Sequence, residues 1–147
     1  MPDQQTPERV MAFDFGIRRM GVAIGQSLTG TASPLAMIPA RDGIPDWNRI
    51  EALVKEWRPD LFVVGLPLNM DDSESEMCRR ARKFARRLHG IYHRPYAMMD
   101  ERLTSFEAKS VVLARGKSRN FGEAGIDDLA AVLILESWFL QQAQSPT

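Results

Sequence analysis

Residues 60–67, DLFVVGLP, limit the possible folds most strongly, because almost every position in this run is apolar. An unbroken apolar run of this length is typical of a central strand that is covered on both faces. A chain of 147 residues with such a strand needs helices on both sides of one sheet. The apolar content of 44% and the charged content of 26% are ordinary for one soluble globular protein.

The remaining pattern alternates between strands and helices. In chain order we expect strands over residues 9–15, 20–26, 32–39, 60–67 and 94–102, and helices over about 47–58, 77–89, 104–114 and 126–141. A hairpin-rich start followed by alternating elements predicts an α/β fold, with a mixed sheet and helices on both faces. Ligands of such sheets bind at the carboxyl ends of the strands.

Single residues refine these boundaries. Pro34 confines the third strand to a sheet edge or to its own first residues. Asp46 is a good N-cap for the first helix, and Gly90 is a plausible C-cap for the second. The buried stripe of that second helix is expected to consist of Met77, Ala81, Phe84, Ala85 and Leu88.

The sequence contains no repeat and no interdomain linker, which predicts one domain over residues 1–147 with an ordered core over about 9–141. No apolar run approaches the roughly 20 residues of a membrane span, and the N-terminus lacks the apolar region of a signal peptide. The single Cys78 excludes an internal disulfide framework. We therefore expect a cytoplasmic protein that does not bind membranes.

The charges are unevenly distributed although the formal net charge is zero. Four acids lie within residues 71–76, and residues 77–99 contain seven lysines and arginines but no acid. Such a segment can bind phosphate groups, or it can be the solvated face of a helix whose N-terminal acids complement the helix dipole. The sequence leaves both interpretations open.

Three carboxylates stand at the ends of otherwise apolar elements. Asp14 lies near the end of the first strand, Glu101 ends the last strand, and Asp127 lies in the first turn of the last helix. If these ends converge, the carboxylates repel one another unless a cation is bound, and Mg²⁺ or Mn²⁺ prefers such oxygen ligands. Paired divalent ions at such a cluster suit phosphodiester hydrolysis.

Each carboxylate also has a separate structural interpretation. Asp14 can form the turn before Gly16, Glu101 can pair with Arg102, and Asp127 can complement the helix dipole.

Four stretches together resemble one family: FDFGIRRMGVAIG, VVGLPLNMDDSESE, DERLTSFEA and IDDLAAVLILESWF. In this order and spacing, over about residues 9–141, the chain is similar to the YqgF (RuvX) family. The resemblance implies a ribonuclease H-like fold with a five-stranded mixed sheet whose first three strands are antiparallel. It also implies a nuclease, described as Holliday-junction-resolvase-like and as acting on pre-16S rRNA in cytoplasmic ribosome maturation.

The acidic residues of that family fall on Asp14, Glu101 and Asp127, which the resemblance implies are catalytic and hold one or two Mg²⁺ or Mn²⁺ ions. Asp100 should point away from Glu101, because side chains alternate along a strand. Asp128 is likewise rotated by about 100° from Asp127 on a helix.

Five cations near these acids are candidates for binding the substrate backbone: Arg18, Arg19, Arg102, Lys117 and Arg119. One position departs from the family pattern, since Asp72 stands where a Gly is usual in the loop after GLPLNMD. A negative charge at that point would weaken phosphate binding, although Asp tolerates the left-handed conformation better than most residues.

The expected partner is nucleic acid, RNA in preference to DNA, within a pre-ribosomal particle, and the chain is expected to be a monomer or a weak homodimer. A Holliday-junction resolvase is the first alternative and normally needs a symmetric dimer. A non-catalytic RNA-binding assembly factor is the second. An ATP-binding protein of the actin and Hsp70 type is the third, but 147 residues have room for only one of the two domains that it needs.

Overall fold

The structure is a computed structural model that describes residues 8–69, 71, 73–103, 114 and 126–144. Its elements, in chain order, are β1 (Arg9–Asp14), β2 (Arg19–Gln26), β3 (Thr31–Arg41), β4 (Ile44–Pro45), α1 (Trp47–Trp57), β5 (Leu61–Leu66), α2 (Glu76–Tyr92), β6 (Tyr96–Asp100), the 3₁₀ helix η1 (Glu101–Leu103) and α4 (Ile126–Gln144).

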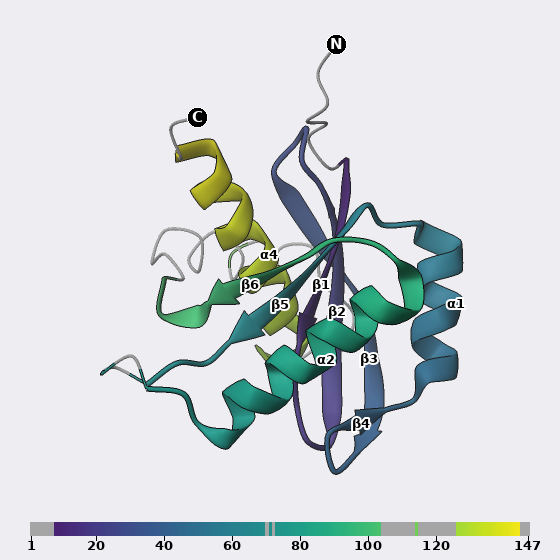
Figure 1. The fold of residues 1–147 in the computed structure, drawn as a ribbon. Coiled ribbons are helices and arrows are strands. Elements are labelled where there is room, and N and C mark those ends of the chain that lie inside the picture. The colour runs from purple at the N-terminus through teal and green to yellow at the C-terminus, as the bar shows by residue number, and fades with distance from the viewer. Residues whose placement is uncertain (1–7, 70, 72, 104–113, 115–125, 145–147) are drawn as a thin grey trace.

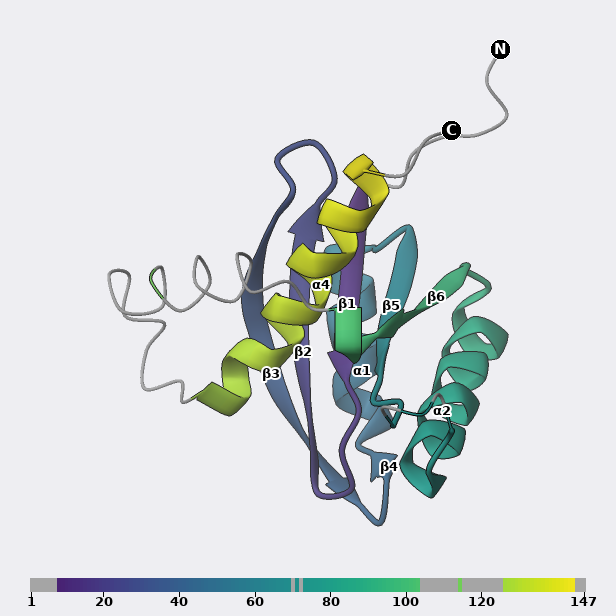
Figure 2. The same cartoon turned by 90° about the vertical axis from the view of Figure 1, so that its left-hand side faces the viewer.

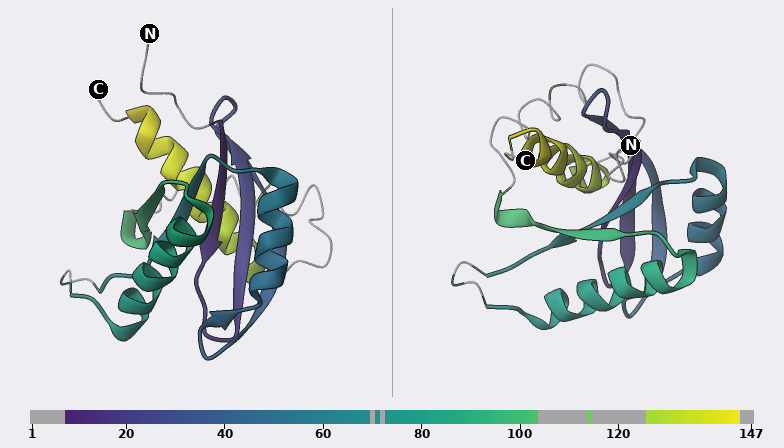
Figure 3. Two further views of the ribbon diagram at one scale, coloured as in Figure 1. Left: turned by 45° about the vertical axis from the view of Figure 1, so that its right-hand side comes forward. Right: turned by 45° about the horizontal axis from the view of Figure 1, so that its top comes forward.

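One mixed sheet organises these elements, with the strand order β4-β3-β2-β1-β5-β6. The pairs β1–β2, β2–β3 and β3–β4 are antiparallel, whereas β1–β5 and β5–β6 are parallel. Helix α4 lies on one face, and α1 and α2 lie on the other (Figure 1, Figure 3). The expected mixed sheet with helices on both faces is confirmed. The sheet has six strands rather than five, because the two-residue β4 pairs with the end of β3.

The two central strands, β1 and β5, divide the core into two layers. Val10 and Ala12 belong to the layer beneath α4, while Met11 and Phe13 belong to the layer beneath α1 and α2. All four side chains are fully buried, and β5 is buried along its whole length. The apolar run that forms β5 is therefore a central strand covered on both faces, as its composition predicts.

The hairpin of β1 and β2 turns at Gly16. A Cβ atom built on Gly16 would lie 2.2 Å from the carbonyl oxygen of Arg19, so no side chain fits there. Asp14 pairs with Gly21 at the end of the ladder, which places the turn directly after Asp14. The close approach of the backbone therefore fixes both the turn and the end of β1.

Strand β3 is longer than expected, and Pro34 explains its irregularity. The register with β2 changes between Val22 and Ala23, so that Val22 pairs with Ala36 and Ala23 pairs with Pro34. The extra residue between Pro34 and Ala36 forms a bulge, and β4 reaches only Ala40 and Arg41. Pro34 thus lies at an edge where no strand of the described part of the chain pairs with it, as expected, but in the interior of a strand of 11 residues.

Helix α1 begins as expected at Asp46, whose carboxylate accepts a hydrogen bond from the Asn48 N–H at 3.1 Å. The predicted end of α2 was wrong. The helix passes through Gly90 and ends at His93, which has a φ of 57° and donates its N–H to the His89 carbonyl. Tyr92 extends the buried side of α2 because its ring packs against that of Phe62, with the ring centroids 5.9 Å apart.

The buried stripe of α2 also differs at one position, because Cys78, rather than Met77, is its first buried residue. The predicted helix over 104–114 and the basic loop over 115–125 lie outside the described residues, apart from residue 114. The single domain and the ordered core over 9–141 stay predictions. Among the helices that the structure describes, none has the length and apolar character needed to cross a bilayer.

Substitution of Gly16 by Ala should destabilise the fold by about 1–3 kcal/mol, because the added methyl group overlaps a backbone carbonyl that cannot move away without opening the hairpin. Urea unfolding measured by circular dichroism would give this change in the free energy of unfolding.

Gly90 provides the matched control, because a Cβ atom there meets nothing within 4 Å and the residue lies inside α2. Gly90→Ala should stabilise the protein by about 0.5–1 kcal/mol. Equal effects of the two substitutions would contradict the role assigned to the Gly16 turn.

Candidate active site

Two acidic residues meet where the parallel strands end. Strands β1, β5 and β6 run in the same direction, so their carboxyl ends lie at one edge of the sheet (Figure 1). Asp14 is the last residue of β1, and Glu101 directly follows β6. Both continue the side-chain alternation of their strands on the α4 face, since Ala12 and Met99 belong to the layer beneath that helix.

Gly65 of β5 makes room for the Glu101 side chain. This glycine lies between the two acidic strand ends, because its strand pairs with β1 on one side and with β6 on the other. A Cβ atom on Gly65 would lie 3.0 Å from Glu101 Oε2 and 2.7 Å from Cδ1 of Ile134. The Glu101 carboxylate therefore occupies space directly above β5, against α4.

The position of Glu101 changes its acidity. The pKa of its carboxyl group is raised to about 7, first by burial and then by the negative charges of Asp14 and Asp100. The charge on Asp14 is thus close enough to act on Glu101. A bound cation would relieve this repulsion, and two carboxylates suit a hard divalent ion such as Mg²⁺ or Mn²⁺.

Helix α4 runs toward the same edge of the sheet when it is followed back to its N-terminus (Figure 2). Phe139 contacts Gly25, whose β1 partner is Val10 at the start of that strand, whereas Ile134 contacts Gly65 near the end of β5. Asp127 lies seven residues before Ile134, about 10 Å farther along the helix axis and at nearly the same angle around it. Its side chain lies outside the described residues.

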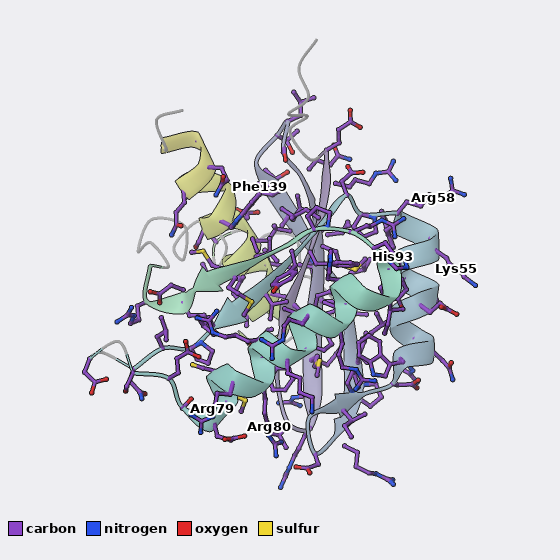
Figure 4. The ribbon with its side chains drawn as sticks, viewed as in Figure 1. Lys55, Arg58, Arg79, Arg80, His93 and Phe139 are labelled. Carbon is purple, nitrogen blue, oxygen red and sulfur yellow. The ribbon has the colours of Figure 1, made fainter. Side chains whose placement is uncertain are left out.

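No group of three His, Cys, Asp or Glu side chains able to hold a metal ion occurs among the side chains that the structure describes. Asp14 and Glu101 are two of the three residues expected to bind a metal ion, and the side chain of the third, Asp127, lies outside the described residues. The two histidines lie at the other end of α2, where Figure 4 shows His93, so they take no part in this site.

Asp100, the last residue of β6, has a partner of its own. Arg102 donates to both carboxylate oxygens of Asp100, from Nε at 3.0 and 3.2 Å and from the second guanidinium nitrogen at 2.8 Å. The hydrogen bonds with Arg102 hold the pKa of Asp100 below its usual value. Arg102 also donates to the Asn69 carbonyl oxygen at 3.0 Å, which ties the end of β6 to the loop after β5. Arg102 therefore pairs with Asp100, so the pairing of Glu101 with Arg102 considered from the sequence does not occur.

Arg18 and Arg19 lie beside Asp14. The two arginines are exposed and line a hollow of about 370 Å³ together with Asp14 and Gly16. This location is suitable for contact with an anionic substrate. Lys117, Arg119 and Asp72, in contrast, lie outside the described residues, and their predicted roles stay predictions.

Sequence reasoning did not identify Gly65 as part of the site. The available signal was a glycine inside an otherwise apolar central strand, which often marks close approach of another group.

A family model described as "RuvX: Holliday junction resolvase" matches residues 8–141. A protein of Marinobacter nauticus is 64% identical over 143 residues, which cover 97% of this chain and 99% of the relative. A protein of Saccharophagus degradans is 52% identical over 141 residues, with 96% and 99% covered. Both relatives carry the name "Putative pre-16S rRNA nuclease".

Solved structures with similar folds include Thermus thermophilus RuvC in complex with a Holliday junction substrate. It has a TM-score of 0.61 at 13% identity, with 93% of this chain and 96% of that chain covered. The yeast mitochondrial Holliday junction resolvase has a TM-score of 0.57 at 13% identity, with 97% and 82% covered. At this identity the likeness establishes the fold alone, which agrees with the expected ribonuclease H-like architecture.

The raised pKa of Glu101 predicts that stability depends on pH in the absence of divalent ions. Between its ordinary pKa of 4.5 and the folded value of about 7, the folded state binds more protons than the unfolded state. The contribution of Glu101 to stability is therefore complete below pH 4.5 and is lost as the pH rises through 7. As the pH rises from 5 to 8, the free energy of unfolding of Glu101→Gln should increase by about 1–2 kcal/mol relative to that of the unmodified protein, after allowance for the partial exposure of Glu101. Thermal unfolding in chelator measures this difference.

Glu51→Gln on α1 is the control, because Glu51 is exposed and pairs with Lys55 only across 3.7 Å of surface. Its stability should follow the pH dependence of the unmodified protein. A Glu101→Gln variant that does the same would refute the close approach of Asp14 and Glu101.

Proposed function

Since the chain belongs to the RuvX family, we propose that it is a metal-dependent nuclease that hydrolyses phosphodiester bonds. The observation that carries this proposal is the convergence of Asp14 and Glu101 at the carboxyl ends of β1 and β6, on either side of β5. Partly buried carboxylates that repel each other are an unfavourable arrangement, which a bound cation would relieve. The arrangement is therefore better explained by ion binding than by stability.

The proposed substrate is the 5′ leader of pre-16S rRNA, and the proposed setting is a pre-ribosomal particle in the cytoplasm. The names of the relatives that are 64% and 52% identical support this choice. RNA is preferred over DNA for the same reason.

Asp14, Glu101 and Asp127 would hold one or two Mg²⁺ or Mn²⁺ ions. When bound, such ions supply Lewis-acid activation of water and neutralise charge that develops on the scissile phosphate. Glu101 can give up its proton near pH 7, so it becomes a charged ligand in the physiological range. Gly65 keeps the space above β5 open for its carboxylate.

The cations beside the acids would position the substrate backbone. Arg18 and Arg19 border the hollow that contains Asp14 and are exposed to an incoming strand. Arg102 is held by Asp100 and by the Asn69 carbonyl, so its guanidinium group has a fixed orientation. Lys117 and Arg119 are proposed to bind phosphates farther along the strand.

A Holliday-junction resolvase is the second candidate, because the family model is described in those terms. The same acidic residues would serve that reaction, but symmetric cleavage of a junction normally needs two copies of the site in a dimer. A non-catalytic RNA-binding factor would keep the fold without cleavage. Cleavage assays separate these three possibilities.

Asp14→Asn should reduce cleavage of a labelled RNA with the 16S 5′ leader by about 100-fold or more, because removal of one charged group at a reacting centre has effects of this size. The assay compares the unmodified protein and the variant in Mg²⁺, in Mn²⁺ and in chelator. Cleavage by the unmodified protein in either metal, and none in chelator, is the expected result.

Glu51→Gln again serves as the control, because it removes a carboxylate of the α1 surface. An Asp14→Asn variant with full activity would exclude Asp14 from the reaction. Cleavage of a four-way DNA junction but not of the leader RNA, together with a dimeric mass in solution, would favour the resolvase. Binding of RNA without cleavage in any metal would favour the assembly factor.

Binding of the metal can be measured without activity. Mg²⁺ should raise the thermal unfolding temperature of the unmodified protein at pH 8. The free energy of unfolding should increase by about 1.4 kcal/mol when the ion concentration is tenfold above its Kd. The gain should shrink as the pH falls below 7, where a proton competes for Glu101. Asp14→Asn should lose most of the gain, and an equal gain in this variant would place the ion elsewhere.

A further inference from the structure

A second hollow lies on the face of the sheet opposite to Glu101. It has a volume of about 230 Å³ and is formed by Phe15, the β3–β4 turn, Trp47 and the N-terminal half of α2. That half of α2 follows the loop that leaves β5, so it lies at the edge of the sheet that carries the acidic site (Figure 1). Figure 4 shows Arg79 and Arg80 at this end of the helix.

Several hydrogen bonds fix the walls of this hollow. The Gly43 N–H donates to the Ile17 carbonyl oxygen at 2.9 Å, which joins the β3–β4 turn to the β1–β2 turn. Arg80 donates to the carbonyl and carboxylate oxygens of Asp42, both at 3.3 Å. Asp42 and Gly43 have φ values of 51° and 81°, typical of the tight hairpin turn that an Asp-Gly pair favours. The hollow is therefore a product of defined contacts between three elements.

The cations of α2 include two groups with different surroundings. Arg79 pairs with Glu76 at 2.7 Å, and Arg82 pairs with Glu74 at 2.8 Å. These two guanidinium groups are neutralised by the acids that precede and begin the helix.

Lys83 and Arg87 form the other group and line the hollow. Among the described ion pairs, neither of them has a carboxylate partner. Among the described residues of the lining, Asp42 is the single acid, and it pairs with Arg80. The hollow therefore has an excess of positive charge although the protein has none overall.

Trp47 holds the outer cation of this pair in place. The guanidinium carbon of Arg87 lies 5.2 Å from the centre of the Trp47 ring, which is within the range of a cation–π interaction. The other neighbour of Trp47 is Phe84, with ring centroids 5.6 Å apart. An oriented guanidinium group at the rim of a basic hollow is suited to bind a phosphate group.

This hollow and the acidic site are adjacent along the chain. Asp14 lines the hollow that contains Arg18 and Arg19, and the next residue, Phe15, lines the basic hollow. The β1–β2 turn, which carries both exposed arginines, lies beside the two hollows, since Ile17 lines the first and its carbonyl oxygen accepts from Gly43 of the second.

We propose that the basic hollow is a second binding site for the phosphodiester strand of the substrate, in which Lys83 and Arg87 contact phosphates beyond the point of cleavage. The inference rests on the proposed nuclease function and adds a path for the substrate to it. The contacts are to phosphate, so they are independent of base sequence and apply to RNA and DNA strands alike.

The test is the affinity of a labelled single-stranded RNA of about 16 nucleotides, the upper end of the range that one strand-binding groove covers. Anisotropy measurements use full-length protein with Asp14→Asn, so that the RNA stays intact. Adding Lys83→Gln and Arg87→Gln should weaken binding about tenfold and reduce the slope of affinity against salt by about 0.7 for each lost phosphate contact.

The matched control adds Arg79→Gln and Arg82→Gln to the same background, which removes two positive charges from the same helix. These arginines already pair with Glu76 and Glu74, so the loss of affinity should be less than about threefold. Thermal unfolding of all variants checks that they are folded.

Equal losses in the two double variants would mean that only net charge matters and would overturn the inference. A DNA strand of the same sequence should show the same tenfold loss, and a loss confined to RNA would overturn the assignment to phosphate. If the unmodified protein cuts the leader RNA while both double variants bind alike, the inference alone is wrong. If it neither binds nor cuts either nucleic acid, the proposed function is wrong as well.

Discussion

The repulsion between the carboxylates of Asp14 and Glu101 is the constraint around which the site is organised. The two groups come from strands that flank β5, and Glu101 is partly buried against Gly65 and Ile134. Burial and the nearby negative charges raise the pKa of Glu101 to about 7, so at neutral pH the pair is poised between protonation and binding of a cation. The sheet imposes this proximity because its three parallel strands end at one edge. A fold that only needed stability would not place two acids there.

Much of the fold follows from local patterns in the sequence. The apolar run of β5 identified the central strand, and Asp46 identified the start of α1, because burial on both faces and N-capping are strong local signals. The end of α2 was mispredicted because Gly90 is a common C-cap, whereas the packing of Tyr92 on Phe62 prolongs the helix. The two-residue β4 has no signal of its own. It exists because the Asp42–Gly43 turn brings Ile44 and Pro45 alongside the end of β3.

The candidate site could be predicted in part. Strand alternation predicted different surroundings for Glu101 and Asp100, and the structure shows Asp100 accepting hydrogen bonds from Arg102. Gly65 was missed because its importance comes from the side chain of Glu101, which lies 36 positions later in the chain. Arg79 and Arg82 pair with nearby acids, whereas Lys83 and Arg87 have no carboxylate partner among the described residues. This difference also depends on three-dimensional positions. The sequence shows a run of cations, and only the fold divides it into two groups.

The position of β5 between the two acidic strand ends has a consequence for biosynthesis. Asp14 lies near the start of the chain, while Glu101 and α4 follow after β5 has been made and inserted beside β1. Contacts between residues so far apart in sequence form slowly, since closure of a long loop must come first. A nascent chain on the ribosome therefore contains Asp14 long before it contains Glu101. The proposed ion site would therefore be complete only at the last stage of folding, when most of the chain has already been synthesised.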